Sequence, residues 1–140
     1  AISLLTDVSF PKPSTMAAAA TVFCPSKSKV SGVTLAQFFK AAVDEDVSTV
    51  PGVGPAATRM LEEGDFNIQT THALIGIFLS LRKKGMTTQE HCNAFMALLK
   101  EQGISAHRNT ITRAIAEKVN TMIPGVYDTS ELDEYDSEEE

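Results

Sequence analysis

The stretch of this 140-residue chain best suited to chemistry is Pro51–Pro55, read PGVGP, which holds two prolines and two glycines. Glycine adopts positive φ angles without steric cost, and its missing side chain lets a ligand approach the backbone closely. Gly52 and Gly54 flank Val53, and Pro55 suits the first turn of a following helix. Because a helix N-terminus carries partial positive charge and unpaired N–H groups, this loop predicts an anion site, with phosphate the usual anion.

The same loop also suits a purely structural corner. In that interpretation the glycines only allow two helices to pack closely, and no ligand is involved. The motif alone does not decide between the two interpretations.

Charge is distributed unevenly along the chain, whose net charge is -6. Residues 26–124 carry 11 basic and 9 acidic residues, which gives 11 − 9 = +2, whereas residues 125–140 carry 8 acidic residues and no basic one. The acidity therefore belongs to the C-terminal tail, and the faintly basic body remains compatible with a polyanionic partner.

The other reactive side chains form no recognisable catalytic or metal-binding set. His72, His91 and His107 lack a common ligand spacing, and a structural zinc site needs four converging ligands. No nucleophile, base and orienting acid occur together, and GVGP lacks the Gly-Lys-Ser/Thr of a P-loop. Two cysteines, Cys24 and Cys92, are no disulfide framework and favour a reduced intracellular compartment. We therefore expect a protein that is not an enzyme and has no metal and no cofactor.

Hydrophobic periodicity predicts an all-α fold, a compact bundle of about five short helices. The expected helices cover about 35–44, 55–63, 71–83, 88–102 and 106–123. Thr34 with Gln37, and Thr87 with Glu90, fit capping boxes, and Ser105 is the expected cap of the last helix. The expected core contains the phenylalanines Phe38, Phe39, Phe66, Phe78 and Phe95.

Composition divides the chain into three parts. Residues 1–30, rich in Ala, Ser, Thr, Pro and Lys, are expected to be a flexible segment: an organellar transit remnant, or sequence upstream of a natural start at Met16. Residues 31–125 form the helical domain, and residues 126–140 an acidic disordered tail. No apolar run approaches the length of a bilayer span, so no membrane insertion is expected. The expected location is intracellular, in the nucleus or cytoplasm, with a plastid or mitochondrion as the alternative.

The acidic tail has two functional interpretations and one in which it has no specific binding role. It could compete with DNA for the basic face of the body, or bind a basic protein partner; alternatively it only aids solubility. Ser130 and Ser137 are each followed three residues later by an acidic residue, which resembles sites of acidophilic kinases. Phosphorylation would add roughly -1.5 to -2 charge per site.

The sequence VPGVGPAATRMLEEG, residues 50–64, resembles the helix-hairpin-helix of DNA-binding proteins. In that family the hairpin amides hold a DNA phosphate without reading bases. The order of elements over residues 38–123, with LEEG and the apolar FLSLRKK, also resembles barrier-to-autointegration factor. This resemblance implies a SAM-like helical fold, sequence-independent binding of double-stranded DNA, a homodimer that bridges two duplexes, and protein partners at the inner nuclear membrane.

Carried over position by position, the resemblance implies these DNA-binding residues: Gly52, Val53, Gly54, Ala56, Ala57, Arg59, Ala106, His107 and Arg108. Met60 and His107 stand where the family has basic residues, which removes phosphate contacts. Each neutralised phosphate contributes about 0.9 to the salt dependence of binding, so a body at only +2 implies weak, salt-suppressed affinity unless a dimer adds avidity. The alternative function is a helical protein–protein interaction module, or an accessory subunit of a larger assembly, that keeps the fold without DNA binding.

Overall fold

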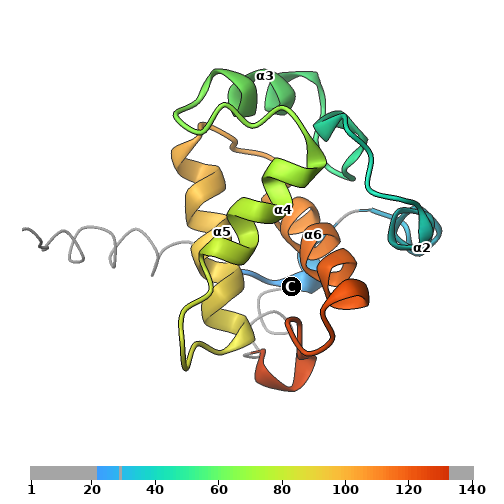
Figure 1. The fold of residues 1–140 in the computed structure, drawn as a ribbon, viewed down its shortest axis with the longest axis vertical. Helices are drawn as coiled ribbons and strands as arrows, with labels where there is room; N and C mark the ends of the chain where they lie inside the picture. The colour runs from blue at the N-terminus through green and yellow to red at the C-terminus, as the bar shows by residue number, and fades with distance from the viewer. Residues whose placement is uncertain (1–21, 29, 133–140) are drawn as a thin grey trace, which may run out of the picture.

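The computed structural model describes residues 22–28 and 30–132, which form five α-helices and no β-strand (Figure 1). This confirms the predicted all-α bundle of short helices. The α-helices are α2 (Gly32–Lys40), α3 (Pro55–Glu63), α4 (Thr71–Ser80), α5 (Thr88–Glu101) and α6 (Arg108–Met122). Three 3-10 helices accompany them: η2 (Pro25–Lys27), η3 (Val47–Thr49) and η4 (Thr129–Glu131).

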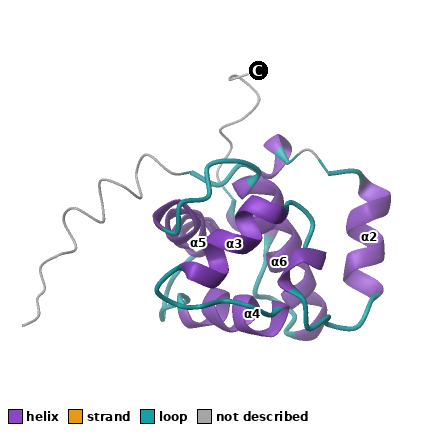
Figure 2. Ribbon diagram, turned by 90° about the horizontal axis from the view of Figure 1, so that it is seen from above, coloured by secondary structure: helices purple, strands orange, loops and turns teal. Residues whose placement is uncertain are grey.

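Helix α6 is the centre of the bundle. It packs against α5, α2, α4 and η2, and α2 lies at one side of the molecule, next to α6 (Figure 2). Ile111, Ile115 and Val119 recur at helical spacing along α6 and are all fully buried. Burying such a stripe supplies most of the stability of a helix this short. Helix α6 therefore provides the support on which the hairpin before α3 is positioned.

Two helices begin where local sequence signals place them. Pro55 is the first residue of α3, and Gly64 follows its last residue. At the start of α5, Thr87 accepts a hydrogen bond from the Glu90 amide at 3.2 Å, and Glu90 accepts one from the Thr87 amide at 3.0 Å. The predicted capping box of α5 is therefore confirmed.

Three helices have ends other than those predicted. Helix α2 covers Gly32–Lys40 and not 35–44, because the Ser31 side chain caps it by accepting from the Thr34 amide at 3.1 Å. Helix α4 ends at Ser80 and not near residue 83, and Arg82 beyond it donates to two loop carbonyl oxygens. Helix α6 begins at Arg108, and its cap is not Ser105.

The prediction that Phe66 belongs to the core is wrong. Phe66 is 50% exposed, because α3 ends before it and the chain turns there. Ile68 occupies the core in its place. It is fully buried and donates its amide to the Leu61 carbonyl at 2.8 Å. The tight turn is completed by Asn67, whose φ is 49°.

The packed part of the molecule extends beyond the predicted range of 31–125. Phe23 is fully buried, donates its amide to the Asn93 side chain at 2.9 Å, and meets Tyr127 edge-on at 6.3 Å. Val126 and Tyr127 are also buried. The predicted flexible and acidic segments otherwise lie, at 1–21 and 133–140, outside the described residues. In the part of the chain that is described, no helix is long and apolar enough to cross a bilayer.

Candidate anion-binding surface at the hairpin

The hairpin between η3 and α3 is a type II β-turn. Val50 accepts a hydrogen bond from the Val53 amide at 3.0 Å, Pro51 occupies the second position, and Gly52 the third with φ 94°. A type II turn requires positive φ at its third position, which makes glycine the natural residue there. Local sequence alone therefore accounts for the shape of this turn.

The first arm of the hairpin is a single 3-10 turn, η3. Three valines, Val47, Val50 and Val53, fix the arm to the core, with 0%, 1% and 6% of their surfaces exposed. Val53 was predicted to bind DNA. Its side chain is buried and anchors the loop.

Gly52 is held against α6. A β-carbon at Gly52 would lie 2.9 Å from Cγ1 of Ile111 and 3.1 Å from Cγ2 of Thr110. These distances are shorter than carbon atoms tolerate without movement of a neighbour. Gly52 is therefore required by packing as well as by its positive φ.

Gly54 stands in a different environment. It is exposed, it precedes the first residue of α3 with an extended φ of -95°, and a β-carbon built on it has no described atom within 4 Å. A side chain would fit, and serine or aspartate would cap the helix, which contributes only about a few tenths of a kcal/mol relative to glycine. The fold as described does not require glycine at this position.

Helices α3 and α6 are the ones, among the five described, that begin without a side-chain cap. The other three are capped by Ser31, Thr70 and Thr87. The first amides of a helix have no acceptor within the helix, so the amides of Ala56 and Ala57 remain available at the start of α3. At the start of α6, His107 adopts a left-handed conformation with φ 63°.

Both uncapped helix starts border the same hollow, a space of about 200 Å³. The structure brings these six of the nine predicted residues around it: Gly52, Gly54, Ala56, Ala57, Ala106 and His107. The hairpin supplies one wall, and the turn before α6 supplies the opposite wall. The positive ends of two helix dipoles thus converge on one opening.

The two predicted arginines lie differently. Arg59 borders a neighbouring hollow together with Thr58 and Glu62, on the other side of Gly54. Arg108 is half-buried and donates one guanidinium N–H to the Ile104 carbonyl at 2.9 Å. Within the described residues, its buried Nε has no hydrogen-bond partner. Arg59 is thus the exposed cation of the pair, while Arg108 partly serves the turn before α6.

Two residues outside the predicted set of DNA-binding residues, Met60 and Ser105, also line the hollow. Met60 lies opposite Gly103, with its sulfur 3.0 Å from a β-carbon built there, and Ser105 exposes its side chain on the α6 side. The spacing between Gly54 and Met60 along α3 indicates that Met60 faces the hollow. Ser105 could be found only after the helix start was known, because it had been expected to cap α6.

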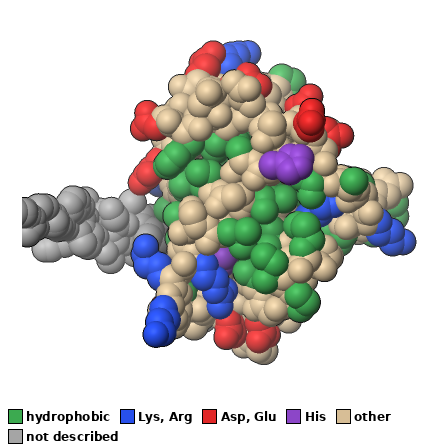
Figure 3. Space-filling model, viewed as in Figure 1, with side chains coloured by type: hydrophobic (Ala, Val, Ile, Leu, Met, Phe, Trp, Pro, Cys, Tyr) green, Lys and Arg blue, Asp and Glu red, His purple; other side chains and the backbone are tan. Residues whose placement is uncertain are grey.

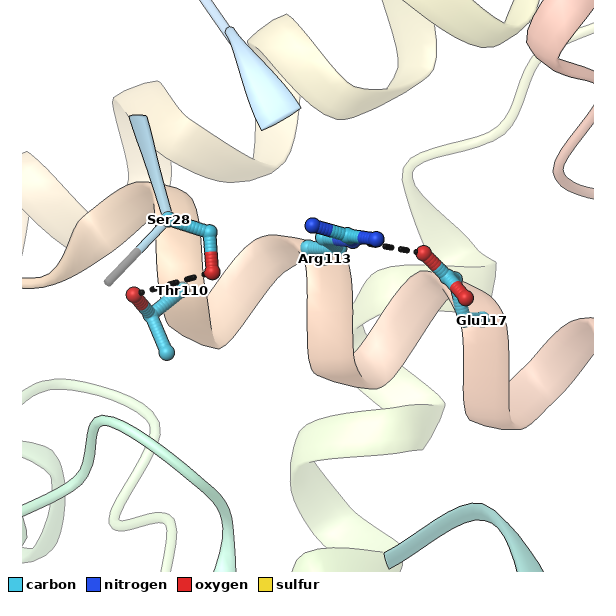
Figure 4. Close-up of polar contacts among 4 residues, drawn as sticks. All are labelled: Ser28, Thr110, Arg113 and Glu117. Carbon is cyan, nitrogen blue, oxygen red and sulfur yellow. Dashed lines mark hydrogen bonds and ion pairs between the residues drawn. The ribbon is translucent and has the colours of Figure 1, made fainter. Parts of the chain in front are cut away.

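The surroundings of the hollow are not strongly basic. Acidic side chains gather over α3 in Figure 3, and this short helix carries Glu62 and Glu63 against the single cation Arg59. Further along α6, Arg113 is paired with Glu117 at 2.7 Å, and Thr110 donates a long hydrogen bond of 3.4 Å to Ser28 (Figure 4). The backbone amides therefore contribute more to an anion site here than side-chain cations do.

His91 and Cys92, both in α5, are buried and structural. His91 is fully buried and stacks on Phe78 at a centroid distance of 4.0 Å. Burial raises the pKa of the Cys92 thiol to about 12, so the nucleophilic thiolate is scarce at neutral pH. No group of three or more potential metal ligands converges within residues 22–28 and 30–132.

Comparisons with known protein families, with curated protein sequences and with solved structures found no match to this chain.

Proposed function

We propose that this chain is a non-enzymatic protein that binds double-stranded DNA through its phosphates and without sequence preference. The observation that carries the proposal is the pair of uncapped helix starts, at Gly54 and His107, on one hollow. The available amides of Ala56 and Ala57 at the start of α3, together with the dipoles of both helices, favour an anion. The step from an anion to duplex DNA comes from the resemblance of the hairpin sequence to helix-hairpin-helix proteins.

The expected affinity is low. Of the two cations in the predicted set, Arg59 shares its hollow with Glu62, and Arg108 donates to the Ile104 carbonyl. If about three phosphates are contacted, the logarithm of the binding constant should fall with a slope of about -2.7 against log salt. This slope distinguishes the proposed weak binding from that of tight DNA-binding proteins, whose slopes are several times larger.

A homodimer would compensate for this weakness through avidity. Helix α4 supports such a dimer, because hydrophobic side chains gather on the face of the molecule where α4 lies in front (Figure 3). Leu74, Ile75 and Phe78 point into the core, yet Ala73 and Ile77 remain exposed or half-buried on the same helix. The exposed side of α4 also carries His72 and Ser80, so a second copy would meet a face that is only partly apolar. We place the second copy against this face of α4, and such a dimer would act in the nucleus or cytoplasm.

A salt titration with duplexes of unrelated sequence tests the proposal, comparing the full chain with Gly54→Glu. Gly32→Glu is the matched control, since both glycines have open space for a β-carbon within the described residues and both stand at a helix start. We expect measurable binding near about 50 mM salt, loss in Gly54→Glu and retention in Gly32→Glu. Equal loss in both variants, or no binding by the unmodified chain, would refute the proposal.

A protein–protein interaction module is the second candidate. It is favoured by large exposed hydrophobic side chains outside the hollow, Val33 at 69% and Phe66 at 50%. Single exposed hydrophobics are common, so this observation is weaker. Replacement of Val33 and Phe66 by serine should abolish partner capture in this case and leave DNA binding unchanged in the first.

A further inference from the structure

The residues that follow α6 form a strap across the start of α5. This C-terminal strap, residues 126–132, contains η4 and continues into the acidic tail. Val126 accepts a hydrogen bond from Arg82 at 3.3 Å, and the buried Tyr127 packs against Phe23. The first part of the tail is therefore integrated in the fold.

The strap is joined to α5 by one threonine. Thr88, the first residue of α5, donates its amide to the Glu131 carboxylate at 2.8 Å and its hydroxyl to the same oxygen at 2.9 Å. The Thr88 hydroxyl also accepts the Asp128 amide at 3.0 Å. Hydrogen bonds to a charged group at a helix N-terminus are among the stronger ones in proteins. This junction ties the strap to the start of α5.

Ser130 lies between the two residues of the strap that reach Thr88. Its side chain is exposed, its hydroxyl donates to the Asp128 carboxylate at 2.7 Å, and its amide donates to the same oxygen at 3.0 Å. These bonds hold the pKa of Asp128 below its usual value, so the carboxylate is charged at neutral pH. The sequence after Ser130 reads ELDEYD, with acidic residues one and three positions on.

We propose that Ser130 is a phosphorylation site for an acidophilic serine kinase, and that its phosphate opens the C-terminal strap. In the transfer, the Ser130 oxygen bonds to the γ-phosphorus of ATP, the bond to the β-phosphate oxygen breaks, and ADP leaves. The hydroxyl proton passes to the base of the kinase. Because kinases bind extended segments, the turn at Asp128 opens before transfer.

Closure of the strap is then opposed by charge. The modified Ser130 no longer donates to Asp128, and a phosphate of about -1.5 to -2 charge stands beside that carboxylate and beside Glu131. The N-terminus of α5 cannot offset this repulsion by binding the phosphate, because the Thr88 and Thr87 amides already donate to Glu131 and Glu90. Opening would expose Val126 and Tyr127, which are buried in the closed form.

The experiment has two arms, and neither depends on DNA binding. In the first, the full chain is incubated with an acidophilic kinase and ATP, and the sites are mapped by mass spectrometry. Phosphate should appear on Ser130, and faster in Thr88→Val, whose strap opens more readily. Phosphate on Ser137 alone, with a control acidic peptide fully modified, overturns the assignment of the site.

In the second arm, a full chain carrying phosphoserine at position 130 is compared by hydrogen exchange with one carrying it at position 137. The amides of Thr88, Asp128 and Glu131 should exchange about tenfold faster in the first chain only. Unchanged or slower exchange overturns the opening of the strap. Ser130→Ala separates loss of the hydroxyl from gain of charge, and its effect should be the smaller.

Discussion

Cγ1 of Ile111 lies 2.9 Å from the point where a β-carbon on Gly52 would stand. This contact joins the hairpin to α6, the central helix. Since the turn also holds Gly52 at φ 94°, its backbone shape and its packing both require glycine.

Gly52→Ala should therefore destabilise the protein. A left-handed conformation costs a residue with a side chain about 1–3 kcal/mol, and the crowding with Ile111 and Thr110 adds to it. Urea unfolding measures the change. Gly32→Ala is the control, since it is helical with open space in the described structure and should be neutral or slightly stabilising. Equal effects of the two substitutions would contradict the packing role of Gly52.

Gly54→Ser should have opposite effects on stability and on binding. Serine at this position can accept the Ala56 or Ala57 amide, and relative to the glycine present this cap contributes only about a few tenths of a kcal/mol. The same bond occupies an amide that the proposed phosphate needs. We expect a higher unfolding midpoint together with weaker DNA binding, measured on one preparation. A more stable variant with undiminished DNA affinity would exclude these amides from the binding surface.

The hairpin and its helix could be predicted from sequence because they depend on neighbours in the chain. Pro55 and Gly64 mark α3 by their own backbone restrictions, and Thr87 with Glu90 marks α5 through a bond within one turn. The end of α4 depends instead on tertiary contacts around Arg82. Local sequence patterns do not predict contacts with residues that are distant in the chain.

The candidate site was predictable to the same extent. Residues of the hairpin came together as expected, whereas the directions of Arg59 and Arg108 depend on how α3 and α6 are rotated about their axes. Phe23 could not be predicted to be buried, because its partners Gln89 and Asn93 lie more than sixty positions away in α5. Composition alone suggested a flexible segment there.

His91 should make the protein less stable at acidic pH. Burial lowers the pKa of His91, the Arg82 charge lowers it further, and the hydrogen bond to Phe78 opposes both. Because the Phe78 carbonyl only accepts, Nε2 carries the proton at 2.7 Å, and Nδ1 faces Arg82 at 3.5 Å. With a lowered pKa in the folded state, the unfolded chain binds the proton first as pH falls below about 6.5, and stability decreases.

Urea midpoints between pH 7.5 and 5 measure this effect. His91→Gln retains a donor for the Phe78 carbonyl and should flatten the pH dependence. His72→Gln, at an exposed position, is the matched control substitution. A slope that survives in His91→Gln would assign the acid sensitivity to another group.

Lys118 should hold α2 against the bundle. Its side chain is buried, its ammonium donates to the Phe38 carbonyl at 2.7 Å and to that of Ala41, and it lies 5.0 Å from the Phe38 ring centroid. Lys118→Met keeps most of the volume and removes these bonds, with an expected loss of about 1–3 kcal/mol. Hydrogen exchange should rise in α2 more than in α5. Lys100→Met, at an exposed position, is the control and should change neither helix.

Met60→Lys should strengthen DNA binding. Met60 is 40% exposed and borders the hollow beside Gly103, where the resemblance implies a basic residue. A lysine stem can keep the apolar contact while its ammonium reaches a phosphate at the opening. The salt dependence should steepen by about 0.9, the contribution of one additional phosphate contact. Phe66→Lys adds the same charge at an exposed position that does not line the hollow, and it should have a smaller effect on affinity. If the two lysines raise affinity equally, attraction depends on overall charge, and the hollow between α3 and α6 does not position the DNA.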